Sequence, residues 1–168
     1  MNRRSSNPAA PKPRRTTRSW REKLADSKDL PKVVTLDSGA SLAIPAPSEV
    51  DQLIRRIPRG SLATISVLRA ALASRHHADS ACQMTIGIFA WIAARAAEEA
   101  ASEGTTDITP YWRLLKEKGE INPKCPGGIP ALTTRLNAEG HAVHQRGNRF
   151  FVTDYERAII AASDLLSP

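Results

Sequence analysis

A tyrosine and a tryptophan stand side by side in TPYWRLLKEKGEINPKCPGG, residues 109–128 of a chain that is only 5% aromatic. Adjacent aromatic side chains offer faces on which a nucleic-acid base can stack, a contact worth about 1–3 kcal/mol per base. The same side chains can instead fill a core, because Tyr and Trp are commonly buried with one polar contact. Tyr111 and Trp112 therefore indicate either a surface on which a base can stack or a pair of ordinary core side chains.

The same segment holds a candidate nucleophile, Cys125. A thiolate is a nucleophile, but a cysteine with no His or cation beside it in the sequence is usually inert. Tyr111 is a poorer candidate, because a phenol has a pKa near 10 and no base stands next to it in the sequence. We therefore predict a protein without enzymatic activity and without catalytic residues.

The positive charge of the chain lies almost wholly in its first fifth. The formal net charge is +7, and residues 1–33 hold ten Lys or Arg against three acids, so residues 34–168 balance to zero. Residues 1–19 combine Pro, Ser and Arg without apolar periodicity, which predicts a disordered basic tail. Such a tail can track phosphates, or it can be a solubilising or lipid-surface segment, and composition leaves both roles open.

Composition also bounds the class of protein. No stretch approaches the about 18 consecutive apolar residues of a membrane span, and the N-terminus lacks the apolar region of a signal peptide. The two cysteines and four histidines show no zinc-like spacing. We expect a cytoplasmic, nucleoid-associated monomer with no membrane contact, no metal and no other cofactor.

Helical periodicity and turn residues predict the first half of the fold. A short helix in residues 19–29 is expected to dock Trp20, and apolar runs on either side of 38–40 predict a hairpin. Further helices are expected at 47–58 with Ser48 as the capping residue, at 64–75, and from about 84 to 104. Two short helices, a tight connection and a longer third helix together indicate a helix-turn-helix.

The rest of the chain predicts another helix and a second hairpin. A helix from about Ile129 should end at Gly140, and alternation around Gly147 predicts a hairpin that is a candidate wing. Asp154 is expected to cap a last helix. The predicted fold is mainly α with small β elements: a disordered tail (1–19), a helix and hairpin (20–46), and a winged helix-turn-helix domain (47–168).

Four motifs, in order, resemble the C-terminal DNA-binding domain of the O6-alkylguanine-DNA alkyltransferases, the methylated-DNA-protein cysteine methyltransferases. IPRGSLAT (57–64) is similar to the family's Pro-x-Gly-x-Val-x-Thr, and MTIGIFAW (84–91) to its recognition helix. Residues 109–128 stand where the family has Pro-Cys-His-Arg-Val and a Gly-Gly loop. LNAEGH (136–141) matches its closing Leu-x-x-Glu-Gly. The resemblance covers about residues 47–140 and is strongest to alkyltransferase-like proteins, which lack the acceptor cysteine.

The resemblance implies an inactive relative. Tyr111 stands at the position of the acceptor cysteine, Trp112 at that of the histidine and Thr133 at that of the glutamate, so the whole proton relay is replaced. It further implies that the partner is duplex DNA, bound through the minor groove. The protein would recognise alkylated guanine and present this lesion to DNA-repair proteins. A transferase that uses Cys125 is an alternative.

The resemblance and the positions of the basic residues suggest two sets of site residues. The expected DNA-binding residues are Ile65, Ser66, Arg69, Gln83, Met84, Thr85, Gly87 and Arg95. The expected lesion pocket consists of Tyr111, Trp112, Arg113, Cys125, Pro126, Gly127 and Gly128. Met84 stands where the family has its intercalating arginine, and Ile65 where it has a tyrosine; a Met can still act as an apolar wedge between bases.

A protein-interaction module with a filled pocket is the main rival hypothesis. The neutral charge of residues 34–168 and the replacements at Met84 and Ile65 favour it. Clustering of Arg69, Arg75 and Arg95 beside Met84 would favour DNA binding, and their dispersal would favour the interaction module.

Overall fold

The computed structural model of the protein describes residues 17–167, so the predicted tail lies outside these residues except for its last three positions. The α-helices are α1 (Trp20–Ala25), α2 (Pro47–Arg55), α3 (Ile65–Arg75), α4 (Gln83–Ser102) and α5 (Gly128–Asn137). The strands are β1 (Lys32–Thr35), β2 (Ser41–Ile44), β3 (Ala63–Thr64), β4 (Ser80–Ala81), β5 (Leu114–Leu115), β6 (Val143–Arg146) and β7 (Arg149–Val152). Short 3₁₀ turns occupy Tyr111–Arg113, Glu117–Gly119 and Tyr155–Ala158.

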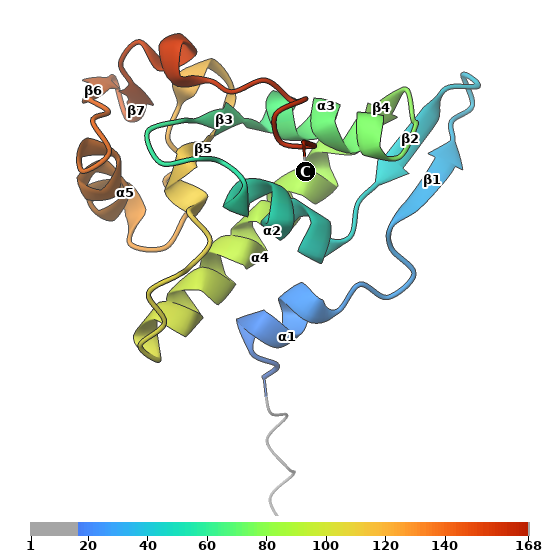
Figure 1. Cartoon of the computed structure of the whole chain (residues 1–168), viewed down its shortest axis with the longest axis horizontal. Helices are drawn as coiled ribbons and strands as arrows, with labels where there is room; N and C mark the ends of the chain where they lie inside the picture. Colours follow the sequence, from blue (N-terminus) through green and yellow to red (C-terminus); the bar gives the residue numbers. More distant parts are fainter. Residues whose placement is uncertain (1–16, 168) are drawn as a thin grey trace, which may run out of the picture.

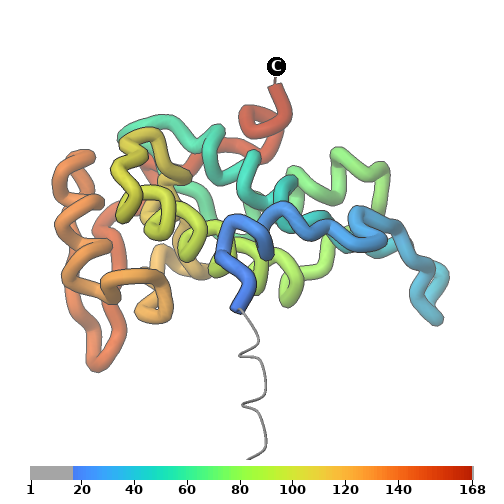
Figure 2. The backbone as a smooth tube through the Cα atoms, turned by 90° about the horizontal axis from the view of Figure 1, so that it is seen from below, coloured from blue at the N-terminus to red at the C-terminus, as the bar shows by residue number. Residues whose placement is uncertain are grey.

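Helix α4 runs through the middle of the molecule (Figure 1). The hairpin β1–β2 lies at one end, where β2 pairs in parallel with β4, and α5 with the hairpin β6–β7 lies at the other. Between them β3 pairs with β5 in parallel. Figure 2 shows α1 lying across the underside of this arrangement, against α4.

Two hydrophobic clusters meet along α4. The first gathers side chains of α2, α3 and the N-terminal part of α4, including Leu53, Leu68 and Ile86, all with no exposed surface. The second lies under α5 and β7 and includes Leu132 and Leu136. Because burying a leucine stabilises a fold by about 1.5–3 kcal/mol, these clusters hold α4 and its neighbours in fixed positions.

The predicted hairpins and helix ends are found. The turn of β1–β2 contains Gly39 with φ +83°, and the turn of β6–β7 contains Gly147 with φ +60°. Helix α4 ends two residues before Gly104, and Gly140, with φ +90°, follows the end of α5. Left-handed backbone favours glycine, which is why these residues marked the ends correctly.

Two predictions about helix caps are wrong. Ala46, not Ser48, is the N-cap of α2, and Glu49 accepts a hydrogen bond from the Ala46 N–H at 2.9 Å. Asp154 caps no α-helix: its φ is +50°, and only the 3₁₀ turn of Tyr155–Ala158 follows. The backbone of the next residues instead forms hydrogen bonds with Leu62. The Leu62 N–H donates to Ala158 O at 2.8 Å, and Leu62 O accepts from the Ile160 N–H at 3.0 Å.

None of the helices described within residues 17–167 has the length and apolar character needed to cross a bilayer.

Candidate nucleic-acid interface

A groove of about 1250 Å³ lies between the N-terminal half of α4, the segment 114–125 and the hairpin β6–β7. We call it the α4 groove. The residues of α4 that line it are Gln83, Met84, Gly87, Ile88, Ala90 and Trp91. Spacings of three and four residues place Met84, Ile88 and Trp91 on one face of the helix, so this face forms one wall.

That wall carries two large apolar side chains that nothing covers among the described residues. Met84 is 74% exposed and Ile88 is 51% exposed. A single exposed apolar residue is ordinary, but two on adjacent turns beside a groove mark a contact surface. Gly87 between them leaves open space above the backbone, with no atom near the position of a Cβ. A flat ligand can therefore approach this face of α4 closely.

Positive side chains surround the α4 groove. They are Lys116, Lys118 and Lys124 on the segment 114–125, and Arg146 and Arg149 on the hairpin. Among residues 17–167, no carboxylate lies within 4.0 Å of Lys118, Lys124 or Arg146, and all three are exposed. Charges of this kind, unpaired and on mobile stems, suit phosphate binding.

Four acids also line the groove, and two of them accept hydrogen bonds from other residues of the protein. Glu117 accepts hydrogen bonds from the N–H and hydroxyl of Ser66, at 2.9 and 2.8 Å, at the start of α3. Glu120 is 5% exposed and binds both Arg149 and Lys116. The bond from Arg149, with help from Lys116, lowers the pKa of Glu120 to about 2. Asp154 and Glu156 are the other two, and both are exposed at its edge.

Tyr111 lies at the floor of the α4 groove and is 3% exposed. Its hydroxyl donates to Glu98 Oε1 at 2.9 Å, and Arg135 donates to the same oxygen at 2.6 Å. Burial and the bond to Glu98 raise the pKa of Tyr111 far above its ordinary value. A carboxylate does therefore lie beside this phenol, although none is near it in the sequence, and it holds the proton on the hydroxyl.

Trp112 does not line the α4 groove. Its Nε1 donates to Glu139 at 2.9 Å, and the guanidinium of Arg135 lies 4.5 Å from its ring centre. Arg113 binds both oxygens of Glu139 and donates to Ile57 O at 2.6 Å. Burial alone would raise the pKa of Glu139, but bonds from Arg113 and Trp112 outweigh it and lower that pKa. Trp112 and Arg113 thus join α5 to the end of α2.

Cys125 lines the groove near Tyr111, while the three residues after it do not. Burial raises the pKa of the Cys125 thiol to about 11, although Arg95 opposes this. Pro126 is buried. Gly127 has φ +76°, and a Cβ there would lie 2.5 Å from Ala131 Cβ, so it is required for the turn into α5. Gly128 is the first residue of that helix.

The expected DNA-binding residues are only partly brought together. Ile65, Gln83, Met84 and Gly87 line the α4 groove, whereas Ser66, Arg69, Thr85 and Arg95 do not. Arg69 donates to Ala81 O at 3.0 Å, and the Arg95 guanidinium lies 5.1 Å from the Trp91 ring. Arg75 lies 3.8 Å from Glu49. The three arginines are therefore dispersed over separate contacts.

Sequence reasoning missed all five basic residues of the groove and its aromatic wall. Lys118, Lys124 and Arg146 are far apart in the chain, and Trp91 and Phe151 also line the groove. The charges of residues 34–168 balance, so no compositional signal marked them. The sequence did predict a recognition helix and a wing. If these two elements had been assumed to lie side by side, basic residues of the hairpin would have been expected near Met84.

The described residues contain no group of three or more His, Cys, Asp or Glu side chains placed to hold a metal ion. No protein-family model matches the sequence, and no curated protein matches it. A solved structure that resembles the chain is that of S. pombe Atl1 in complex with damaged DNA containing O6-carboxymethylguanine. The two are 16% identical with a TM-score of 0.46, over 68% of this chain and 93% of that chain.

Proposed function

We propose that the protein is a non-catalytic DNA-binding protein of winged helix-turn-helix type, in which α3 and α4 form the helix-turn-helix and β6–β7 the wing. The observation that carries this proposal is the exposed Met84–Ile88 face of α4 with Lys118, Lys124 and Arg146 around the same groove. The apolar face suits the floor of a minor groove, where apolar side chains wedge between base steps. The cations suit the phosphates on either side.

The finer proposal is that the α4 groove recognises alkylated guanine and presents it to DNA-repair proteins. A base turned out of the duplex would meet Trp91 and Phe151, which line the groove, rather than Trp112. Tyr111, fixed by Glu98, would form the floor and would not react. Recognition without transfer is the role that this arrangement supports.

The test is a fluorescence-anisotropy titration of the full chain with matched duplexes, one unmodified and one with a single O6-methylguanine, at about 50 and about 200 mM salt. Each phosphate contact contributes about 0.9 to the slope of log K against log salt, so Lys118→Ala and Arg146→Ala should each flatten it by about that amount. Arg157→Ala removes an exposed charge outside the groove and should leave binding unchanged. Met84→Ala should weaken binding at both salt concentrations.

Equal slopes for the groove variants and Arg157→Ala would reject DNA binding by the α4 groove. Equal affinity for the two duplexes would reject the lesion-specific form alone. The second candidate is a winged-helix protein-interaction module, which the dispersal of Arg69, Arg75 and Arg95 favours. If the protein is an interaction module, the groove variants should not change the affinity for either duplex or its dependence on salt.

A further inference from the structure

One side of the hairpin β6–β7 carries two aromatic rings and two arginines. The strands pair so that His144 lies opposite Phe151, and two residues nearer the turn Arg146 lies opposite Arg149. Because alternate residues of a strand point to the same side of a sheet, these four side chains share one side of the hairpin. All four line the α4 groove, whereas Gln145, on the other side, does not. We call this four-residue side of the hairpin the platform.

The exposed ring of the platform, His144, is held in a fixed orientation. It is stacked on the ring of Phe151, with centres 5.8 Å apart and planes inclined by 22°. Its Nδ1 and the hydroxyl of Thr153 are hydrogen-bonded at 2.9 Å. Phe151 is half-buried and covers one face of the imidazole, while His144 itself is exposed. The other face can therefore receive a flat ring, and little ordering of the protein is needed because the imidazole is already oriented.

The two arginines of the platform face each other across the strands. Like charges directly opposite one another destabilise a pair of strands, so this arrangement needs a negative partner. Glu120 supplies one to Arg149, whose guanidinium also lies 5.4 Å from the Phe151 ring centre. Arg146 is exposed, and among residues 17–167 no carboxylate lies within 4.0 Å of it. Its charge is available to an anion that enters the groove.

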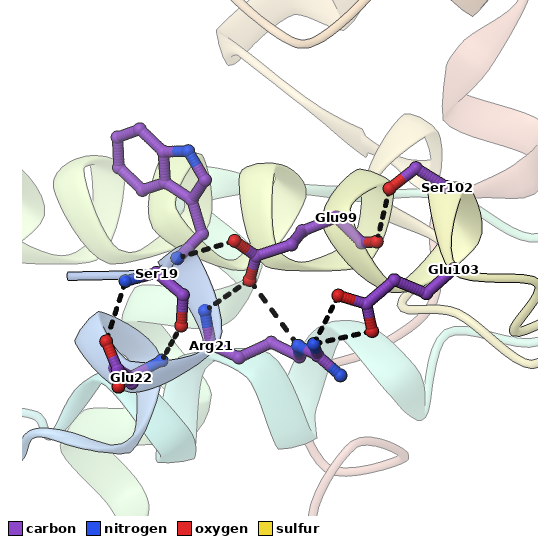
Figure 3. Close-up of polar contacts among 7 residues, drawn as sticks. Ser19, Arg21, Glu22, Glu99, Ser102 and Glu103 are labelled. Carbon is purple, nitrogen blue, oxygen red and sulfur yellow. Dashed lines mark hydrogen bonds and ion pairs between the residues drawn. The ribbon is translucent and has the colours of Figure 1, made fainter. Parts of the chain in front are cut away.

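An arginine that serves the fold has a different environment, as Arg21 of α1 shows (Figure 3). The Arg21 guanidinium binds both oxygens of Glu103 at 2.6 Å and lies 3.4 Å from Glu99. Within the described residues Arg146 has no comparable partner, and it lies beside an aromatic face that can receive a ring. A nucleotide matches both features, because its base can stack on the ring and its phosphate can bind the guanidinium.

We propose that the platform is a binding site for an unpaired nucleotide of DNA, whose base stacks on His144 and whose phosphate binds Arg146. The proposal rests on the proposed DNA-binding function and names the feature of the DNA that the α4 groove selects. Stacking tolerates any base, since every base has a flat face. A paired base must first leave the duplex, at a cost in free energy that an unpaired base avoids. The site therefore selects a base because it is unpaired, whether or not it carries an alkyl group.

The test is a fluorescence-anisotropy titration of the full chain with three otherwise identical duplexes. One is fully matched, one has a single unpaired adenine, and one has a paired O6-methylguanine. His144→Ala removes the ring, and His144→Phe restores a flat ring without the imidazole nitrogens. Gln145→Ala changes an exposed neighbour on the other side of the same strand and is the matched control. Urea denaturation reports whether the variants are folded like the parent.

The parent should bind the duplex with the unpaired adenine at least about fivefold more tightly than the matched one, since stacking of one base contributes about five- to 150-fold. His144→Ala should remove most of this preference and leave the affinity for the matched duplex unchanged. His144→Phe and Gln145→Ala should both keep the preference. Arg146→Ala should weaken binding to the duplex with the unpaired adenine and flatten its slope of log K against log salt by about 0.9.

Three outcomes would count against the platform. If the parent shows no preference for the unpaired adenine, or if His144→Ala keeps the parent's preference, the platform is overturned. Binding to the matched duplex that still depends on Lys118 would then leave the proposed function standing. Tightest binding to the O6-methylguanine duplex would also overturn it, because the groove would then read the alkyl group. Binding to none of the three duplexes would reject the proposed function, and the platform with it.

Discussion

Removing the hydroxyl of Tyr111 tests whether this residue has a structural role in the floor of the groove. It donates to Glu98, which Arg135 also binds. Tyr111→Phe keeps the ring and removes one hydrogen bond to a charged group, so it should lower the free energy of unfolding by about 1–2 kcal/mol, measured by urea denaturation. DNA affinity should not change, because the ring remains. An unchanged stability would contradict the structural role of the bond.

The two cysteines should differ in reactivity. Burial raises the pKa of Cys125 to about 11, so very little of this thiol is ionised at pH 7. The Cys82 thiol is less enclosed; burial would raise its pKa, but bonds from Thr85 and backbone N–H groups at the start of α4 lower it. Iodoacetamide at pH 7.5 should therefore label Cys82 first, as mass spectrometry of the peptides would report. Faster labelling of Cys125, or alkyl transfer to it from an O6-methylguanine duplex, would revive the transferase alternative.

At the scale of elements, Glu120 fixes the hairpin β6–β7 to the segment before α5. It is buried, it binds Arg149 of β7 and Lys116, and the Ile121 N–H donates to Phe150 O at 2.8 Å. Because its pKa is about 2 when folded and near 4.5 when unfolded, the charged form stabilises the fold above about pH 4.5. This stabilisation is lost as the pH falls from about 4.5 towards 2.

Glu120→Gln should lower the free energy of unfolding by about 1–2 kcal/mol at pH 7, and the difference from the parent should shrink as the pH falls to about 3. Glu156→Gln removes an exposed acid of the same groove and is the control, with little change expected. Urea denaturation at several pH values would measure both. A Glu120→Gln difference that does not depend on pH would show that the carboxylate charge is not the stabilising feature.

Elements whose limits depend on local residues were predictable, and those that depend on distant partners were not. Gly39 and Gly147 fixed both hairpins because their left-handed backbone is a local property. The predicted last helix does not form, because the backbone groups of Ala158 and Ile160 are hydrogen-bonded to Leu62, nearly 100 residues earlier, which holds the chain extended. In the site, the resemblance of residues 84–91 to a recognition helix singled out Met84, which is 74% exposed beside the groove. Glu98 could not be paired with Tyr111, since tertiary packing alone joins them.

At the scale of the whole molecule, Arg113 joins the two hydrophobic clusters. It binds Glu139, next to α5 of the second cluster, and the carbonyl of Ile57, which belongs to the first. The side chain of Glu139 is only 3% exposed, so it depends on this partner. Removing one member of a buried ion pair typically costs about 3–5 kcal/mol, because the other charge remains buried.

Arg113→Ala should therefore lower the free energy of unfolding by about 3 kcal/mol, measured by urea denaturation, and Arg113→Lys should recover only part of it because Lys cannot bind both Glu139 oxygens and Ile57 together. Arg157→Ala is the control, since its partner Asp154 lies 3.8 Å away and both side chains are exposed. That pair should contribute less than about 1 kcal/mol. If Arg113→Ala were no worse than Arg157→Ala, the clusters would be held together by apolar contacts along α4 alone. The position of α5 and the hairpin relative to Met84, and so the shape of the groove, would then not depend on the ion pair.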